Sequence, residues 1–368
     1  MGGLRVAVDA TPLIGRRTGV GRYVEQLVRT ASGCPEQARL VLTGITVRGS
    51  AAIPRSPAWD VVARPFSARL AQELWRRGVG VPSGAWFAGR HQVFHGTNFV
   101  LPPLGRGRAG VVTVHDLAWL RFADTVSVAS RALRDLVPRS IRRAALILVP
   151  SQAVGDQLGE DLGVPADRIR VTPLGVDEAW LQARPDDALA RRLNLPERYV
   201  VVVATHEPRK NLPFLLAAHR EACATESDTP PLVLVGGHGW GPEVEASSGR
   251  VRVTGFLPDG ELRSVVAGAC ALALPSLVEG FGLPVLEAFA VGIPVLAADL
   301  PVLHEVSGGL AHVADPADRQ AWAALLVDPP TQDPGPLRAR AAASTWQACA
   351  AATLTAYRDA AEARATTA

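Results

Sequence analysis

Lysine, cysteine and long apolar runs are scarce in this 368-residue chain. Of its 38 Lys and Arg residues only Lys210 is a lysine, which makes it either a leftover or a functional choice. The four cysteines are scattered without a CxxC pair, which argues against zinc and a disulfide framework and fits a reducing cytoplasm. No apolar run approaches the roughly 18 to 20 residues of a membrane span, and the first run, ending at Asp9, is too short for a signal peptide.

Apolar residues and arginine are what the chain has in quantity. With 48% hydrophobic and 20% charged residues it is globular, and its length suits two domains. The net charge of +3 hides an asymmetry, because residues 1–175 carry 23 arginines against 12 acidic residues, whereas residues 176–368 carry 15 basic against 23 acidic ones. The basic half could contact an anionic lipid surface, an acidic acceptor or nucleic acid, or be a solvated face without a partner.

Short apolar runs alternate with helical patterns along the first half. Continuous apolar runs separated by helices are typical of a parallel sheet covered on both faces, which predicts a doubly wound α/β domain. After a linker rich in Pro, Gly and Asp at 171–187 the pattern restarts. The predicted strands lie within 4–10, 39–45, 59–65, 91–96, 110–116, 145–151 and 168–176, and then within 199–205, 231–237, 250–255, 271–276 and 294–299.

Two Rossmann-like halves in tandem follow from this repetition. The last stretch, 336–365, is rich in alanine and predicts one helix. Since ligands of open α/β sheets bind beyond the carboxyl ends of the strands, we expect the two domains to face each other across a cleft. The functional side chains should therefore follow the strands.

Three loops of the first half carry candidate residues. Gly19 and Gly21 open the first helix, where backbone N–H groups suit an anionic ligand, although a structural turn fits equally well. His115 and Asp116 end a strand and could bind a polar ligand or move a proton, or simply cap the next loop. The segment HGTNFVLPP (95–103) should expose three polar side chains on the acceptor side, or form an ordinary polar loop: His95, Thr97 and Asn98.

The segment HEPRKN (206–211) surrounds the lone lysine. It follows the first strand of the second domain and precedes a helix, so Arg209 and Lys210 should lie at the edge where ligands bind. Two fixed cations beside a helix N-terminus can neutralise a diphosphate. Asn211 is the expected N-cap.

The segment LPSLVEGFGLPVLEAFAVGIPV (274–295) is the most informative stretch. Glu279 precedes a glycine-rich loop, and Glu287 lies one turn into an otherwise apolar helix, where an uncompensated carboxylate would be costly. Carboxylates accept hydrogen bonds from hydroxyls, and loop amides with a helix dipole hold phosphate. This combination indicates a nucleotide-sugar, although two solvated glutamates around a turn would give the same spacing.

At this point the sequence resembles the GT-B glycosyltransferases of family 4, the mannosyltransferase-like group 1 enzymes, over essentially its whole length. EGFGLPVLEAFAVGIPV resembles the E-x7-E signature of the family and HEPRKN its frequent EPRKN segment. VTGFLPDGEL (253–262), LVPSQAV (148–154) and VTPLGVD (171–177) fall in the family order, and STWQACAAATLTAYRDA (344–360) is similar to its last helix, which crosses back to the N-terminal domain. The resemblance implies an acceptor-side domain over 1–176 plus about 345–368, and a donor domain over 177–344.

The resemblance also implies residue roles. Lys210 and Arg209 would hold the diphosphate of the donor, Glu287 the ribose, and Glu279 the transferred sugar. Gly19 and Gly21 would approach the diphosphate, and His115 would reach the transferred sugar. His95, Asn98 and Asp116 stay weaker acceptor-side candidates. The backbone of the loop would hold sugar and phosphate, and two residues would line the nucleobase pocket: Gly280, Phe281, Gly282 and Leu283, and Gly255 and Phe256.

One departure from the family concerns the segment before the lysine. Many members have arginine about six residues earlier, where this chain has Ala204–Thr205, so Arg209 or the N-terminal domain would supply the charge. The family mechanism is retention by front-face attack without a protein nucleophile. No DxD sequence is present, and neither a metal ion nor another cofactor is expected.

Donor and acceptor stay open at this level. GDP-mannose is the favoured donor, with UDP- or TDP-sugars as alternatives. The acceptor is a small molecule, a saccharide or a lipid-linked group, and the basic half allows peripheral contact with an anionic inner membrane face of a cytoplasmic protein; a nucleic-acid partner is not expected. A non-catalytic sugar-nucleotide-binding protein and a nucleotide-sugar epimerase are further alternatives. An NAD enzyme is disfavoured because residue 24 is valine rather than the third glycine of GxGxxG.

Overall fold

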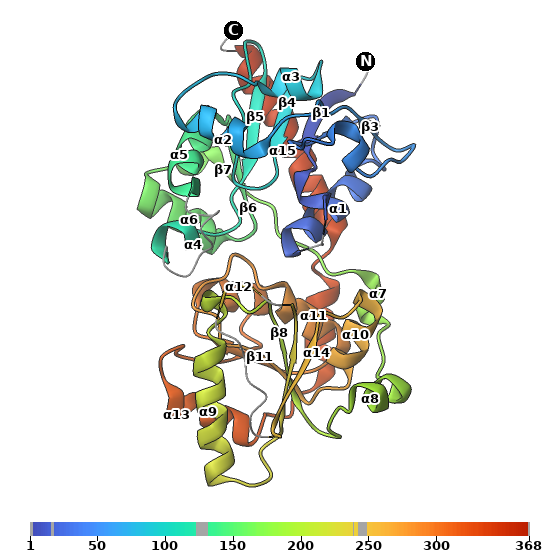
Figure 1. The fold of residues 1–368 in the computed structure, drawn as a ribbon, viewed down its shortest axis with the longest axis vertical. Helices are drawn as coiled ribbons and strands as arrows, with labels where there is room; N and C mark the ends of the chain where they lie inside the picture. Colours follow the sequence, from blue (N-terminus) through green and yellow to red (C-terminus); the bar gives the residue numbers. More distant parts are fainter. Residues whose placement is uncertain (1–2, 16–17, 123–131, 238, 242–248, 367–368) are drawn as a thin grey trace. The chain divides into compact units, whose positions relative to one another are not determined.

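The computed structural model describes residues 3–366 except 16–17, 123–131, 238 and 242–248. The chain forms two compact units (Figure 1). Unit 1 comprises residues 1–120, 128–174 and 346–368, and unit 2 comprises residues 121–127 and 175–345, so far as these are described. Each unit is built around one parallel β-sheet.

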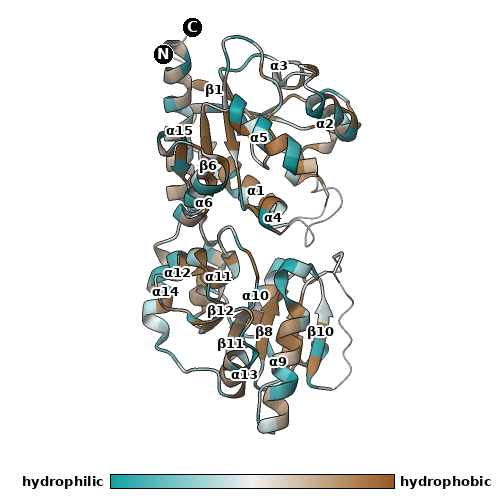
Figure 2. Ribbon diagram, turned by 90° about the vertical axis from the view of Figure 1, so that its left-hand side faces the viewer, coloured by the Kyte–Doolittle hydropathy of each residue, from teal (hydrophilic) through white to brown (hydrophobic). Residues whose placement is uncertain are grey.

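The sheet of unit 1 has seven parallel strands in the order β3-β2-β1-β4-β5-β6-β7. Val6 of β1 pairs with Leu40 of β2 and with Val93 of β4, so the chain winds outward from β1 in both directions. The central strands are apolar and buried on both faces, as the continuous runs predict (Figure 2). The strands are β1 Leu4–Asp9, β2 Ala38–Thr43, β3 Asp60–Val61, β4 Val93–Gly96, β5 Ala109–Thr113, β6 Leu146–Val149 and β7 Ile169–Val171.

Helices cover the sheet of unit 1, and the last of them comes from the far end of the chain. Several start at a serine or threonine whose side chain accepts a hydrogen bond from the first turn, as Thr18 and Ser151 do. The C-terminal helix α15 packs beside α1 (Figure 1). The helices are α1 Gly19–Ala31, α2 Ala68–Arg76, α3 Gly84–Ala88, α4 Ala118–Arg121, α5 Leu133–Arg143, α6 Gln152–Leu162 and α15 Trp346–Thr366.

The sheet of unit 2 has six parallel strands in the order β10-β9-β8-β11-β12-β13. Its first strand is again central, since β8 pairs with both β9 and β11. The strands are β8 Val200–Val203, β9 Leu232–Val235, β10 Val251–Gly255, β11 Ala271–Leu274, β12 Val295–Ala298 and β13 His312–Ala314.

The helices of unit 2 are mostly started by proline. Proline occupies the first turn of α9, α11, α12 and α14, where its missing N–H costs nothing. The helices are α7 Glu178–Leu181, α8 Asp187–Leu193, α9 Leu212–Thr225, α10 Asp259–Ala267, α11 Leu283–Val291, α12 Pro301–Ser307, α13 Arg319–Val327 and α14 Pro334–Ala342. Two parallel-sheet Rossmann-like domains, predicted from the repeated pattern, are thus confirmed.

The prediction of one helix over 336–365 is wrong. The chain forms two helices there, α14 in unit 2 and α15 in unit 1, separated by a short break in which the Ser344 carbonyl accepts a hydrogen bond from Val176 N–H. Alanine favours helix throughout this stretch, so the break has a tertiary cause. α14 packs on α11, where Arg338 donates to the Val291 carbonyl, and α15 packs in unit 1.

The helices of the described residues were also compared with the dimensions of a bilayer. None of them combines the length and the apolar character that crossing a membrane requires.

Candidate active site

Lys210 and Glu279 meet at the carboxyl edge of the unit 2 sheet. Lys210 ends a short 3-10 turn, Pro208–Lys210, that follows β8, and Glu279 lies in the loop that follows the adjacent strand β11. Lys210 Nζ donates to Glu279 Oε1 at 2.6 Å. Residues 69 positions apart are thus brought together because parallel strands end at one edge.

A third side chain fixes the same carboxylate oxygen. Ser276, which is fully buried, donates from Oγ to Glu279 Oε1 at 2.7 Å. Burial alone would raise the pKa of Glu279, but the positive charges of Lys210 and Arg209 and the two hydrogen bonds outweigh it and hold that pKa below its ordinary value. The Glu279 side chain is therefore an ionised acceptor with a fixed orientation.

Arg209 lies beside this pair but has its own carboxylate. Its Nε donates to Glu207 Oε2 at 2.7 Å, and its backbone carbonyl accepts from Leu277 N–H at 2.8 Å, which ties the two loops together. Asn211 precedes α9, yet its side chain makes no capping bond and donates instead to the Pro316 carbonyl. The expected N-cap role of Asn211 is wrong, because its left-handed backbone (φ 55°) turns the side chain away.

The glycine-rich loop leads straight into α11. Gly282 has φ +90°, and a side chain there would also collide with Leu303, so both backbone and space require glycine. Phe281 is buried beneath the loop, and α11 starts at Leu283. Glu287 is 4% exposed on an otherwise apolar helix, which is the costly placement that the sequence indicates.

Gly255 and Phe256 follow β10 at the same edge. Gly255 ends the strand with φ +74°, and the ring of Phe256 is exposed. The segments with Lys210, with Glu279 to Leu283 and with Gly255–Phe256 thus all follow strands of this sheet at their carboxyl ends.

His115 lies at the corresponding edge of unit 1, just after β5. It is buried, and its Nε2 is 2.9 Å from the Thr97 carbonyl. The rings of Tyr23 and Phe99 pack edge-on against it. Burial lowers its pKa, which the contact with Thr97 and the charge of Asp116 offset only in part, so the imidazole is neutral and Nε2 donates.

The prediction that His95 and Thr97 are exposed is wrong. Both are fully buried, because His95 lies within β4 rather than beyond it. His95 Nδ1 is 2.7 Å from Tyr357 Oη of α15 and its Nε2 is 2.7 Å from Thr113 Oγ1, which in turn is 3.0 Å from Tyr23 Oη. His95 is thus part of a buried polar chain that joins α15, β5 and α1, and it is not an accessible acceptor-binding group.

The remaining candidates of unit 1 have mixed surroundings. Asn98 is exposed, and Asp116 is partly buried with Oδ1 accepting from Ala118 N–H. Gly21 lies in the first turn of α1 and its N–H is bonded to Thr18 Oγ1, whereas the space beside Gly19 is open. Arg16 and Arg17, which precede them, lie outside the described residues.

Comparison with known families was made for both halves of the chain. The sequence profile described as Glycosyltransferase Family 4 matches residues 17–180, and the profile described as Glycosyl transferases group 1 matches residues 197–328. The chain belongs to the family 4 glycosyltransferases of the GT-B type. The resemblance stated from the motifs is confirmed.

Relatives of this glycosyltransferase carry related names. It is 28% identical to the O-antigen chain mannosyltransferase B of Escherichia coli, over 96% of this chain and 100% of that protein. It is also 28% identical to a D-inositol 3-phosphate glycosyltransferase of Segniliparus rotundus, over 97% of this chain and 84% of that protein. A mycobacterial relative, the MMP alpha-(1->4)-mannosyltransferase of Mycolicibacterium hassiacum, is 30% identical over 61% of this chain and 56% of its own.

Solved structures share the fold of the glycosyltransferase at low sequence identity. Sucrose-phosphate synthase from Thermosynechococcus elongatus has a TM-score of 0.72 at 19% identity and covers 97% of this chain and 98% of its own. HepE from Anabaena, solved with UDP-glucose, has a TM-score of 0.65 at 16% identity, over 96% and 100% of the two chains. These likenesses bear on the fold.

Sequence reasoning missed two residues of the glycosyltransferase at this edge, Ser276 and Glu207. Each is a polar residue just after a buried strand and within three residues of a charged candidate, which is the signal that could have revealed them. In the described part of the chain no three His, Cys, Asp or Glu side chains form a group suited to a metal ion, and the four cysteines are free.

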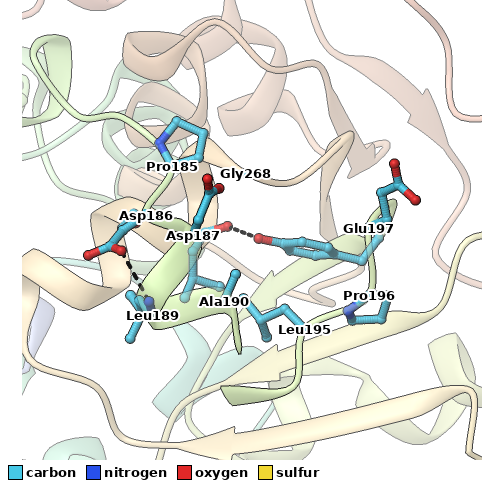
Figure 3. Close-up of a pocket in the computed structure, with 12 residues that line it drawn as sticks. Pro185, Asp186, Asp187, Leu189, Ala190, Leu195, Pro196, Glu197 and Gly268 are labelled. Carbon is cyan, nitrogen blue, oxygen red and sulfur yellow. Dashed lines mark hydrogen bonds between the residues drawn. The ribbon is translucent and has the colours of Figure 1, made fainter. Parts of the chain in front are cut away.

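A cavity of about 230 Å³ lies elsewhere in unit 2 (Figure 3). Tyr199 and Gly268, which line it, precede β8 and β11, so the cavity is at the amino edge of the sheet. Its rim is acidic, with Asp186, Asp187 and Glu197, and Tyr199 Oη donates to the Val265 carbonyl. Asp186 Oδ1 is used to cap α8. This cavity is separated from Lys210 and Glu279 by the length of the strands.

Proposed function

We propose that the protein transfers a hexosyl group, mannose from GDP-mannose, to an acceptor hydroxyl with retention of configuration and without a metal ion. The observation that carries the proposal is the Lys210–Glu279 pair beside the glycine-rich loop and the N-terminus of α11. A compact ammonium, loop amides and a helix dipole together suit a diphosphate, and a carboxylate beside them suits the hydroxyls of a sugar.

In the proposed reaction the acceptor hydroxyl attacks the anomeric carbon on the face from which the diphosphate leaves. The bond from the anomeric carbon to the phosphate oxygen breaks, the bond to the acceptor oxygen forms, and the acceptor proton passes to the leaving phosphate oxygen. Lys210 and Arg209 stabilise the charge that develops on the diphosphate. The backbone from Gly280 to Leu283 would hold sugar and phosphate, and Glu287 the ribose.

His115 is proposed to donate a hydrogen bond to the transferred sugar. A neutral imidazole donates one hydrogen bond without placing a positive charge next to an oxocarbenium-like centre, which would repel it. The lowered pKa of His115, caused by its burial, supports this role. Gly19 and Gly21 are proposed to bring the start of α1 to the diphosphate, and Asn98 and Asp116 to contact the acceptor.

The choice of donor rests on the named relatives. A protein called an O-antigen chain mannosyltransferase, similar along its whole length, favours mannose. HepE, whose structure was solved with UDP-glucose, keeps a UDP-sugar as the alternative. The acceptor is proposed to be a saccharide or a lipid-linked saccharide, because the basic residues of the first 175 positions could hold the protein at an anionic cytoplasmic membrane face.

A panel of GDP-, UDP- and TDP-sugars tests the donor. A ligand of the folded protein raises Tm by mass action, so GDP-mannose should give the largest rise, and mannose should then appear on an acceptor with retained configuration in the presence of EDTA. Lys210→Ala should lose the rise. If no nucleotide-sugar changes Tm of the wild-type protein, the proposed function is refuted. A rise without transfer to any acceptor would favour a non-catalytic sugar-nucleotide-binding protein.

Membrane contact has its own test. Co-sedimentation with vesicles of anionic phospholipid should be strong at low salt and weak at high salt, because surface charges are screened. No binding at low salt would end that part of the proposal.

A further inference from the structure

Two aromatic side chains are the large apolar groups exposed in the described part of unit 2. Trp240 is 47% exposed and Phe256 is 57% exposed, whereas the other exposed large apolar side chains, such as Leu70, belong to unit 1. Single exposed apolar residues need no explanation. These two, however, follow the carboxyl ends of the neighbouring strands β9 and β10, which is the edge that carries Lys210 and Glu279.

The two aromatic-bearing loops are joined through their backbones. Gly236, the first residue after β9, donates from its N–H to the carbonyl of Gly255 at 3.0 Å, and Gly255 directly precedes Phe256. Trp240 follows four residues after Gly236. Both aromatic residues therefore extend from one hydrogen-bonded junction rather than from unrelated surface loops.

The loop with Trp240 is also pressed against the segment that leads to the lysine. Gly241 N–H donates to the His206 carbonyl at 2.8 Å. A Cβ atom at Gly239 would collide with that carbonyl, and one at Gly241 would lie 2.8 Å from it. Such an approach is open only to glycine, so the glycines beside Trp240 set the distance between its loop and residues 206–210.

The order of groups along this edge matches the order of groups in a nucleoside-diphosphate sugar. The strands run β10, β9, β8, β11, and the loops after them carry Phe256, Trp240, Lys210 and Glu279 in that order. Adjacent strands are about 4.8 Å apart, so the aromatic and cationic loops are within the reach of one nucleotide. An aromatic end, a cationic centre and an acidic end correspond to base, diphosphate and sugar.

We propose that Trp240 is the stacking platform of the nucleobase and favours a purine over a pyrimidine. The inference rests on the proposed function and deepens it, since family resemblance points to Gly255 and Phe256 but not to Trp240. An aromatic ring stacks on any base, and the larger face of a purine buries more of the indole. The exposure of Trp240 leaves an indole face for such a contact.

Replacement of Trp240 tests the proposal with three probes: GDP, UDP and inorganic pyrophosphate. In Trp240→Ala the Kd for GDP should rise about 5- to 150-fold, the range expected for loss of one base–aromatic stack. The Kd for UDP should rise less, and that for pyrophosphate, which has no base, should not change. Trp240→Phe should keep most of the GDP affinity. Leu70→Ala, an equally exposed apolar residue of unit 1, is the matched control.

Fluorescence gives a readout that a merely structural role would not move. Trp240 is the most exposed of the eight tryptophans, so GDP should quench the wild-type emission and pyrophosphate should not. The quench should vanish in Trp240→Phe although calorimetry still detects GDP binding.

The outcomes separate this inference from the proposed function. Equal GDP affinity in the wild type and Trp240→Ala overturns the stacking role and leaves the proposed function standing. Equal losses for GDP and pyrophosphate also overturn it, since they would mean a general disturbance of the edge. If wild-type protein binds neither GDP nor pyrophosphate, the proposed function itself fails.

Discussion

The carboxyl edges of the two sheets are built from opposite kinds of chemistry. In unit 2 the edge holds ionised pairs, Lys210 with Glu279 and Arg209 with Glu207. In unit 1 the equivalent region holds histidines that burial keeps neutral, and these are satisfied by hydroxyls and a carbonyl rather than by charges. The same topology thus supplies an electrostatic surface in one unit and a rigid hydrogen-bonded one in the other.

This difference teaches where charge can be afforded in a Rossmann-like unit. The pairs of unit 2 lie in loops beyond the strands, where partial exposure reduces the cost of desolvation. His95 lies inside a strand of a buried sheet, where a charge would have no compensation. The glycosyltransferase can therefore bind an anionic donor with unit 2 and keep unit 1 as the stiff support.

Removing the ammonium should have the largest effect. Lys210→Ala should lower kcat by about 100- to 1000-fold, or about 2.7 to 4 kcal/mol, by analogy with the loss of one preorganised donor. Lys210→Arg keeps the charge but not the compact shape and should recover part of the rate. Initial rates at saturating donor give the answer. Wild-type turnover of the alanine variant would remove the electrostatic half of the comparison.

Removing one hydroxyl from the polar chain of unit 1 should come next. Tyr357→Phe leaves His95 Nδ1 without its partner and should cost about 1 to 3 kcal/mol of stability. Tyr199→Phe, which loses a buried bond to the Val265 carbonyl in unit 2, is the matched variant. Calorimetry should show each variant lowering a different transition. If both lower the same transition equally, the two units do not unfold independently.

Acid should act on unit 1 through His95. Its folded pKa is lowered to about 3, mainly by burial, from 6.5. The unfolded chain therefore takes up a proton that the folded chain refuses, so stability falls as pH falls from 6.5 towards 3, by up to about 1.4 kcal/mol per pH unit. His95→Gln should flatten this slope in urea unfolding between these pH values.

The control for that slope is His304→Gln, which alters an exposed histidine of unit 2 that pairs with Asp299. It should leave the acid dependence of unit 1 as it is. A slope unchanged by His95→Gln would show that the proton uptake comes from other groups.

The smallest effect is expected at Ser276. Its hydrogen bond helps lower the pKa of Glu279, so Ser276→Ala should raise that pKa and move the acid limb of kcat/KM to higher pH. The stability cost should be about 1 kcal/mol. Ser307→Ala removes another buried hydroxyl of unit 2 and should leave the pH profile unchanged. An unmoved acid limb in Ser276→Ala would separate Glu279 from the pH dependence.

The fold could be predicted where burial dominates the sequence. β6 and β8 are apolar on both faces, so their residues alone indicate a central parallel strand. β13 was not predicted, because three residues that begin with His312 carry no such signal. α2 was missed for another reason, since its arginines and glutamate hide the two buried positions, Ala71 and Trp75.

The site could be predicted residue by residue but not contact by contact. The strand-then-loop pattern predicts that Lys210 and Glu279 follow neighbouring strands, yet their direct pairing and the bond from Ser276 depend on side-chain placement. His95 was misplaced because its partner Tyr357 is 262 positions away. No local pattern can indicate that such a partner buries it.

The break between α14 and α15 has a consequence for how the protein is made. Unit 1 is completed by Trp346–Ala368, which is synthesised only after all of residues 175–345. Until then β4 and β5 lack the helix that supplies Tyr357, and a ribosome-bound chain ending near residue 345 should present an open flank on its first sheet while its second is already whole. A fusion that strains α15 would therefore harm the domain that is translated first.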